Sequence, residues 1–245
     1  MLVTGSGSGV GRGIAMALAR EGAHVIVAAR SEVGQTVADT IAARGQLATW
    51  ARCDVTVRES VEAAVDLALA TTGRLDAVVH NATSNASSQP HRLEDVDSSL
   101  WGDHYAVSVG GAYHCAAAAY RPLSRRGGTL LVMTSPAGIE GSATLPLYAT
   151  MKGALRGFAK SLAREWGPDR ITVNVVSPLA YSPAMTAAIE AEPAMEERLA
   201  RRIPLGRIGD PESDIGAAIA FLVGPNARYI TGQTLGVDGG HYMNL

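Results

Sequence analysis

The stretch Thr4-Gly5-Ser6-Gly7-Ser8-Gly9-Val10-Gly11 stands between a short apolar run and a helical pattern, and it decides the fold of the chain. The helical pattern that follows, Ile14-Ala15-Met16-Ala17-Leu18-Ala19, contains good helix formers and ends at Gly22. Glycines let a backbone approach a pyrophosphate closely, and a helix N-terminus presents free N–H groups. We therefore expect a strand, a phosphate-binding turn and a helix, although a merely flexible loop is the alternative interpretation.

The second apolar run, from His24 to Ala29, predicts a strand buried in a parallel sheet. The end of this strand is where dinucleotide-binding folds contact the ribose. An acidic side chain there accepts a hydrogen bond from the 2′-hydroxyl of NAD, whereas an arginine accommodates the 2′-phosphate of NADP. Arg30 and Ser31 occupy that place, so the sequence favours NADP(H), with NAD(H) as the alternative. A solvated Arg30 without a ligand is the competing interpretation.

Strand-like and helical patterns alternate along the rest of the chain, without a linker or an internal repeat. This alternation predicts an α/β fold in which residues 1–245 form a single domain, a doubly wound parallel sheet with helices on both faces. Long helices are expected over 100–120 and from Tyr148 to about Trp166. A helical segment at about 180–202 is expected to cover the substrate.

Polar residues follow the third and fourth predicted strands, at the sheet edge where such folds bind ligands. Asp54 and Val55 come after the third strand, and Asn81 and Ala82 come after the fourth. Asp54 could cap the next helix or bind an adenine amino group, and the sequence leaves both open.

The segment Tyr148-Ala149-Thr150-Met151-Lys152 places a phenol and an ammonium four residues apart, on one face of a predicted helix. A free phenol has a pKa of about 10, and a neighbouring positive charge lowers it. Ser135, which follows an apolar strand, could hold a substrate oxygen against the same phenol. Alone, the pair is weak evidence, because a half-buried tyrosine beside a solvated lysine is the commoner arrangement.

Composition excludes several classes of protein. A formal net charge of −2 gives no electrostatic reason to expect nucleic acid or an anionic membrane as a partner. Cys53 and Cys115 form neither a disulfide framework nor a metal-type pair, and the histidines lack ligand spacing, so we expect no metal site. No apolar run approaches membrane-spanning length, and no signal peptide is recognisable, which indicates a cytoplasmic protein.

Taken together, these motifs resemble those of the classical short-chain dehydrogenase/reductase family over essentially the whole chain. Four signatures carry the resemblance: Thr4-Gly5 with Gly9-Val10-Gly11, Asn81-Ala82, Ser135 with Tyr148 and Lys152, and Gly232-Gln233 with Val237-Asp238-Gly239-Gly240. The closing motif and Pro204-Leu205-Gly206-Arg207 are most similar to 3-oxoacyl-thioester reductases and glucose-type dehydrogenases.

The resemblance implies a Rossmann fold of about seven strands and hydride transfer between a nicotinamide and a carbonyl or secondary alcohol. Tyr148 would be the general acid/base, Ser135 would hydrogen-bond the reacting oxygen, and Lys152 would lower the Tyr148 pKa. A homotetramer, or a homodimer, is implied through the Ala-rich helices. The implied cofactor-binding residues are Gly5, Ser8, Gly9, Val10, Gly11, Arg30, Ser31, Asp54, Val55, Asn81, Ala82, Tyr148, Lys152, Pro178 and Tyr181.

The chain also departs from the family pattern around the expected nicotinamide site. Ser108 replaces an asparagine that helps hold a water chain from the lysine to solvent, and its hydroxyl could carry a shifted relay, which makes it the fourth candidate catalytic residue. Thr83, Leu179 and Pro183 are further departures. They motivate the alternative that the protein binds NAD(P) but has lost efficient catalysis and acts as a sensor or assembly partner.

Overall fold

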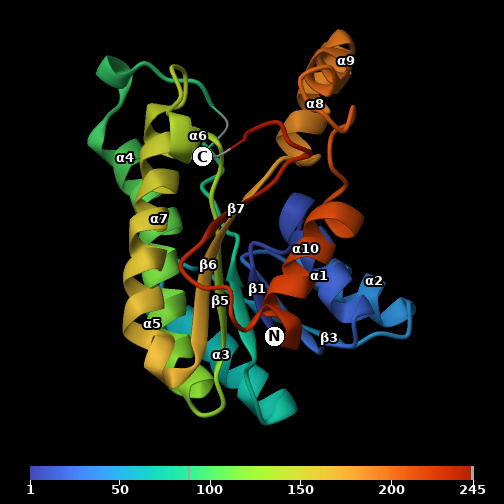
Figure 1. The fold of residues 1–245 in the computed structure, drawn as a ribbon, viewed down its shortest axis with the longest axis vertical. Coiled ribbons are helices and arrows are strands. Elements are labelled where there is room, and N and C mark those ends of the chain that lie inside the picture. The colour runs from blue at the N-terminus through green and yellow to red at the C-terminus, as the bar shows by residue number, and fades with distance from the viewer. Residues whose placement is uncertain (88, 244–245) are drawn as a thin grey trace.

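The computed structural model describes residues 1–87 and 89–243 and shows a seven-stranded sheet in which all paired strands run parallel, in the order β3-β2-β1-β4-β5-β6-β7 (Figure 1). The predicted doubly wound α/β fold is confirmed. The strands are β1 (Leu2–Thr4), β2 (Val25–Ala29), β3 (Ala48–Arg52), β4 (Ala77–His80), β5 (Gly128–Met133), β6 (Ile171–Pro178) and β7 (Thr234–Val237).

Helices cover both faces of this sheet (Figure 1). They are α1 (Gly9–Arg20), α2 (Val33–Ala43), α3 (Arg58–Thr72), α4 (Ser98–Tyr105), α5 (Gly111–Ser124), α6 (Ala137–Glu140), α7 (Pro146–Trp166), α8 (Pro183–Ala191), α9 (Ala194–Ala200) and α10 (Ala217–Val223). None of the helices in the described part of the chain has the length and apolarity that a membrane span requires.

Two hydrophobic layers hold the sheet between these helices. Successive strand residues point to opposite faces, so Leu2 joins the layer under α3, α5 and α7, whereas Val3 joins the layer under α1, α2 and α10. Val78 and Val79 divide between the layers in the same way. Both faces of each central strand are therefore buried, which explains why these strands read as continuous apolar runs rather than alternating ones.

The strand order reverses between β1 and β4, which are hydrogen-bonded neighbours although more than seventy residues separate them. The loops after these two strands leave the same edge of the sheet in opposite directions. A crevice opens at such a switch point, and in doubly wound sheets it is where ligands bind. The topology thus brings the glycine-rich loop and Asn81 to one place.

Two predicted helices differ from the observed ones. The helix expected over 100–120 is divided into α4 and α5 by a π-helical segment, Ala106–Gly110. The segment at 180–202 contains two helices, α8 and α9, with Pro193 between them as the N-cap of α9. A proline lacks the N–H that an uninterrupted helix would need at this point, which accounts for the break.

Candidate active site

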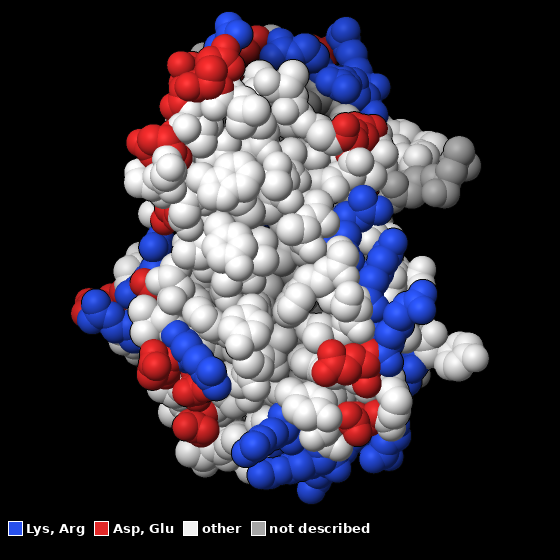
Figure 2. Space-filling model, turned by 90° about the vertical axis from the view of Figure 1, so that its left-hand side faces the viewer, with Lys and Arg blue, Asp and Glu red and all other residues white. Residues whose placement is uncertain are grey.

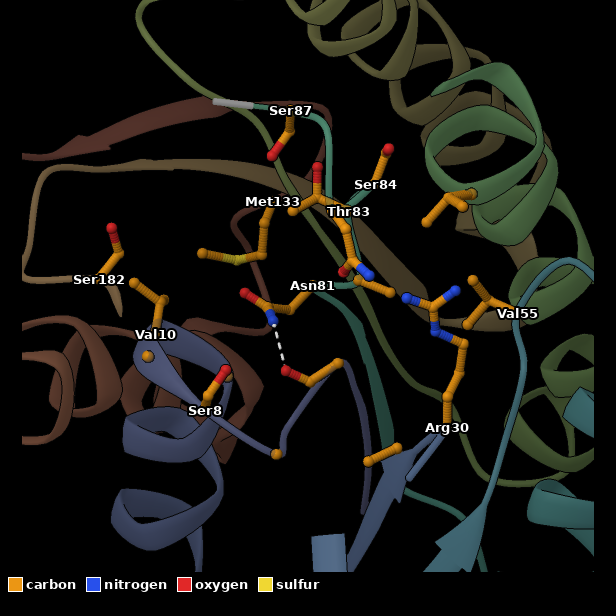
Figure 3. A pocket seen from close by; sticks show the side chains of 18 of the residues that line it. Ser8, Val10, Arg30, Val55, Asn81, Thr83, Ser84, Ser87, Met133 and Ser182 are labelled. Atoms are coloured by element: carbon orange, nitrogen blue, oxygen red, sulfur yellow. Dashed lines mark hydrogen bonds between the residues drawn. The ribbon is translucent and has the colours of Figure 1, made fainter. Parts of the chain in front are cut away.

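A cavity of about 480 Å³ lies at the switch point, and residues from most of the predicted motifs line it (Figure 3). The glycine-rich loop forms one wall, the ends of β2 and β3 form another, and the end of β5 with α7 forms the third. Of the predicted site residues, the lining contains Gly5, Ser8, Gly9, Val10, Gly11, Arg30, Ser31, Asp54, Val55, Asn81, Ala82, Tyr148, Lys152 and Pro178. The fold therefore gathers fourteen of the seventeen sequence candidates around one space.

The loop wall of the cavity is backbone, because three glycines leave no room for side chains. A Cβ on Gly11 would lie 2.3 Å from the Gly5 carbonyl oxygen, and one on Gly5 would lie 2.7 Å from Ala82 Cα. A Cβ on Gly9 would lie 2.9 Å from Pro183 Cδ. The sequence argument linked these glycines to a ligand; the structure shows that they are required first by the packing of the loop against its own chain.

Helix α1 begins at Gly9, and its N-cap, Ser8, makes no side-chain capping hydrogen bond within the described part of the chain. The first N–H groups of a helix have no intrahelical partner, and they carry the positive end of the helix dipole. Because Gly9, Val10 and Gly11 line the cavity, this end of the wall fits a pyrophosphate.

Asn81 ties the loop after β4 to the loop after β1. Its side-chain amide donates to the Gly5 carbonyl oxygen over 3.1 Å, the bond drawn in Figure 3. Its backbone N–H donates to Thr4 Oγ1 over 3.2 Å. Asn81 therefore fixes the shape of the cavity floor.

The opposite wall carries Arg30, whose guanidinium extends from the end of β2 towards Val55 (Figure 3). Arg30 is exposed, and no ion pair is found for it among the described residues. Asp54 accepts hydrogen bonds from the N–H and the hydroxyl of Thr56 at 2.9 and 2.7 Å. It does not cap α3, whose N-cap is Val57, so of the two roles open for Asp54 the helix cap is wrong.

Tyr148 and Lys152 lie together on α7, where one helical turn separates them as predicted. The Lys152 ammonium lies 5.5 Å from the centroid of the Tyr148 ring and donates to the Met133 carbonyl oxygen over 2.9 Å. Lys152 is buried, and this burial lowers its pKa to about 8. The bond to Met133, on β5, attaches the lysine to the carboxyl edge of the sheet.

The pKa of Tyr148 differs from the expected direction. Burial raises it above that of a free phenol, and the hydrogen bond with the Ser135 hydroxyl offsets this rise in part. The expected lowering of the Tyr148 pKa is therefore wrong for the protein alone, because burial withdraws the phenol from water. At neutral pH Tyr148 therefore holds its proton.

Three predicted residues do not line the cavity. Ser135 stands beside Tyr148, and its Oγ accepts from the Ala137 N–H over 3.3 Å. Ser108 lies buried in the π segment, where its backbone carbonyl accepts a hydrogen bond from the side chain of His80 at the end of β4. Tyr181 lies outside because its hydroxyl donates to Glu196 on α9.

Several lining residues were not among the predicted binding residues, although Thr83 and Pro183 had been noted as departures from the family pattern near the nicotinamide. Ser182 and Pro183, at the start of α8, contact the cavity where Tyr181 was expected, and Met133 faces it from β5. Thr83 and Ser87 reach it from the loop after β4. Ser182 could have been proposed from the sequence, because it follows Tyr181 directly in the loop after β6. Within residues 1–87 and 89–243 no group of three or more His, Cys, Asp or Glu side chains could hold a metal ion.

Comparison with known proteins assigns this arrangement to a family. Residues 5–242 match the family model described as enoyl-(acyl carrier protein) reductase. The chain is 36% identical to the 3-oxoacyl-[acyl-carrier-protein] reductase FabG of Escherichia coli over 244 residues, which covers 99% of this chain and 96% of that protein. It is also 36% identical to the short-chain reductase protein NovJ of Streptomyces niveus over 248 residues, covering 98% and 92%.

Solved structures agree with these relatives. A 7α-hydroxysteroid dehydrogenase complexed with NADH and 7-oxo glycochenodeoxycholic acid is 30% identical, with a TM-score of 0.89 over 98% of this chain and 92% of that one. A short-chain type dehydrogenase/reductase from Mycobacterium ulcerans is 30% identical, with a TM-score of 0.90 over 98% and 88%. The chain belongs to the short-chain dehydrogenase/reductase family of oxidoreductases.

Proposed function

We propose that this protein is an NADP-dependent oxidoreductase that transfers a hydride between the nicotinamide and a carbonyl or secondary alcohol substrate. One observation carries the proposal. The half-buried Tyr148 and the buried Lys152 form one wall of a cavity, and another wall is bare backbone at a helix N-terminus without a side-chain cap in the described chain. That cavity has a phosphate-binding end and a proton-donating end, as a nicotinamide dinucleotide and its reaction require.

In the proposed reaction the cofactor, Tyr148, Ser135 and Lys152 have separate roles. The bound nicotinamide supplies or accepts the hydride, and the protein handles the proton. In reduction, Tyr148 gives its phenolic proton to the substrate oxygen, since its raised pKa keeps the phenol protonated at neutral pH. Ser135 donates a hydrogen bond to the same oxygen. Lys152 is mostly charged below its pKa of about 8, so its ammonium stabilises the phenolate that Tyr148 becomes.

Arg30 supports the choice of NADP over NAD. It lies at the end of β2, lines the cavity and carries a charge that no carboxylate in the described chain neutralises. A 2′-phosphate at this edge would offer it a charge-assisted hydrogen bond, and Ser31 beside it adds a hydroxyl donor. With NAD the same guanidinium would face a neutral ribose.

The substrate class is proposed from the relatives. FabG is named as a 3-oxoacyl-[acyl-carrier-protein] reductase, so a 3-oxoacyl thioester is the first substrate to test on this chain. The parts that would adapt the substrate side are the loop after β4 and the α8–α9 segment, which supply Ser84, Ser87, Ser182 and Pro183 to the cavity.

A second candidate function is a dinucleotide-binding sensor or assembly protein with weakened catalysis. The observation that favours it is that Ser108, the residue expected to carry the proton relay, is buried and is not among the residues that line the cavity. Tight NADPH binding without turnover of any carbonyl would support this alternative.

We also propose a homo-oligomer, with two subunits meeting across α4, α5 and α7 and a tetramer as the complete assembly. The face that these helices form is a broad area without charged residues (Figure 2). It exposes the large side chains of Trp101, Tyr105, Tyr113 and Tyr120, and contiguous apolar areas of this kind mark contact sites. A second copy of the same face would cover them. A monomeric mass at micromolar concentration would contradict this assembly.

The experiment that tests the proposed function measures NADPH and NADH oxidation against a panel of carbonyls: acetoacetyl thioesters, simple ketones, aldehydes and quinones. The proposal predicts turnover of at least one member and faster turnover with NADPH than with NADH. Binding of NADPH without oxidation by any member would overturn it.

A further inference from the structure

His80 is a buried histidine at the end of β4 that the proposed mechanism does not use. It is 1% exposed, and both ring nitrogens are engaged: Nδ1 lies 3.2 Å from Thr4 Oγ1, and Nε2 lies 3.0 Å from the Ser108 carbonyl oxygen. A carbonyl only accepts hydrogen bonds, so Nε2 carries the hydrogen and Nδ1 accepts from the Thr4 hydroxyl. The geometry therefore fixes one neutral tautomer.

The charge state agrees with this assignment. Burial and the nearby Lys152 ammonium lower the pKa of His80 to about 3, although the bond to Ser108 opposes the shift. The ring is therefore neutral at the pH at which most enzymes work. Its contribution must come from where it holds other groups.

On one side His80 reaches the floor of the cavity through Thr4. The Thr4 hydroxyl oxygen accepts from the backbone N–H groups of Asn81 and Ala82, at 3.2 and 3.3 Å. With its lone pairs used, the hydroxyl directs its hydrogen to His80. Asn81 and Ala82 line the cavity, so the position of His80 is linked to the position of this backbone.

On the other side His80 meets the π segment between α4 and α5. A π turn widens the helix, and such turns recur at functional sites. The His80 N–H gives the Ser108 carbonyl a partner from outside the helix, while Val107 of the same turn lines the cavity. The helix approaches closely because Gly111 has no side chain; a Cβ there would lie 2.9 Å from His80 Cε1.

We infer that His80 is a positioning residue for the reaction, a bridge that holds the π segment Ala106–Gly110 and the Asn81–Ala82 backbone at a fixed separation across the nicotinamide end of the cavity. This inference rests on the proposed function and extends it.

Two substitutions of His80 separate its two bonds. In His80→Asn the amide can replace Nδ1 and keep the Thr4 contact, but it is too short to reach Ser108. In His80→Gln the amide can reach Ser108. We expect His80→Asn to lower kcat about 10- to 100-fold, the cost of a misplaced reacting geometry, with the dissociation constant for NADPH within about threefold of wild type. His80→Gln should recover part of kcat.

A second measurement does not depend on turnover. In the protein without cofactor, amide hydrogen exchange across residues 106–112 should accelerate in His80→Asn and less in His80→Gln. The matched control is His24→Asn, because His24 Nε2 also bonds a threonine, Thr49 Oγ1 at 2.8 Å, but at the opposite edge of the sheet. That variant should leave exchange in 106–112 and kcat unchanged.

Thr4→Val provides a test if the histidine variants fold poorly. It removes the hydroxyl at nearly constant volume, and Thr4→Ser retains it. If the bridge acts as a unit, Thr4→Val should lower kcat, Thr4→Ser should not, and Thr4→Val with His80→Asn should cost less than the product of the single losses. Independent, multiplicative losses would overturn the inference.

The outcomes distinguish the bridge from the proposed function. If His80→Asn had the kcat of the wild type and the wild-type rate of amide exchange across 106–112, the bridge would be overturned. The proposed function would not be affected. A His80 ring that nitrogen NMR shows protonated at Nδ1, or titrating between pH 5 and 9, would also overturn the bridge. Absence of turnover in the wild type would overturn the function, and accelerated exchange in 106–112 would still support the bridge.

Discussion

The two ends of the cavity are built by different physical means. At the glycine-rich loop, Gly5, Gly9 and Gly11 matter because neighbouring atoms occupy the space that their side chains would need. At the other end, Tyr148 and Lys152 matter because burial changes their affinity for protons. At the first end, the three glycines leave no space for an added side-chain atom. At the second end, the proton affinities of Tyr148 and Lys152 depend on their withdrawal from water. Four predictions test this difference.

The largest effect is expected at the proton-donating end. Tyr148→Phe removes the proposed acid and keeps the ring, so kcat should fall about 10³-fold or more, within the range of general acid catalysis. NADPH affinity should change little. The control is Tyr229→Phe, which removes a hydroxyl from a fully exposed side chain and should leave kcat unchanged. Parallel stopped-flow and fluorescence titrations would measure both; comparable turnover in Tyr148→Phe would disprove its role.

The loop end should respond to a single methyl group. Gly11→Ala places a Cβ 2.3 Å from the Gly5 carbonyl oxygen, so the loop must shift. Overpacking costs about 1–3 kcal/mol, and a cost of this size in the cofactor-binding conformation corresponds to roughly 5- to 150-fold weaker NADPH binding. Gly157→Ala is the control, because Gly157 does not line the cavity and a Cβ there meets nothing within 4 Å. Equal NADPH affinities in the two variants, by isothermal titration calorimetry, would refute the steric account.

The pH dependence of reduction should report Lys152. Its pKa is lowered to about 8, so the ammonium is present below that pH and lost above it. Because the charge stabilises the phenolate formed at Tyr148, the reduction rate should stay level through neutral pH and fall by about tenfold per pH unit well above 8. Stopped-flow rates from pH 6 to 10 would show this, and a rate still rising at pH 9 would contradict it.

The smallest effect is expected at the ribose. Arg30 is exposed, so a contact with the 2′-phosphate is screened by water. Arg30→Ala should weaken NADPH binding by about tenfold, near the low end for a hydrogen bond to a charged group. NADH binding serves as the internal control and should not change. Equal losses for both cofactors in binding titrations would show that Arg30 supports the loop rather than the phosphate.

The sequence predicted the elements whose patterns are local. The last strand, Thr234–Val237, and the end of α7 at Trp166 were placed at their observed residues, because buried apolar runs and helical spacing follow from nearby residues alone. The glycine loop, Asn81, Tyr148 and Lys152 were singled out by their spacing; they line one cavity, and their roles stay predictions.

The remaining features depend on contacts between distant residues. The π segment contains Ser108, whose carbonyl bonds His80 twenty-eight positions away, and no pattern within 100–120 indicates the segment. The direction of the Tyr148 pKa depends on its burial in the folded protein, so its spacing from Lys152 could not reveal it. The exclusion of Tyr181 depends on its bond to Glu196 in the following helix.

The central claim is that both ends of one cavity serve hydride transfer. The most direct test uses NADPH carrying deuterium at nicotinamide C4, prepared separately with each C4 position labelled, and a ketone substrate such as an acetoacetyl thioester. We predict that one of the two labelled forms delivers deuterium to the carbinol carbon of the product, as mass spectrometry would show. Consumption of the ketone with no deuterium in the product from either form would contradict the account.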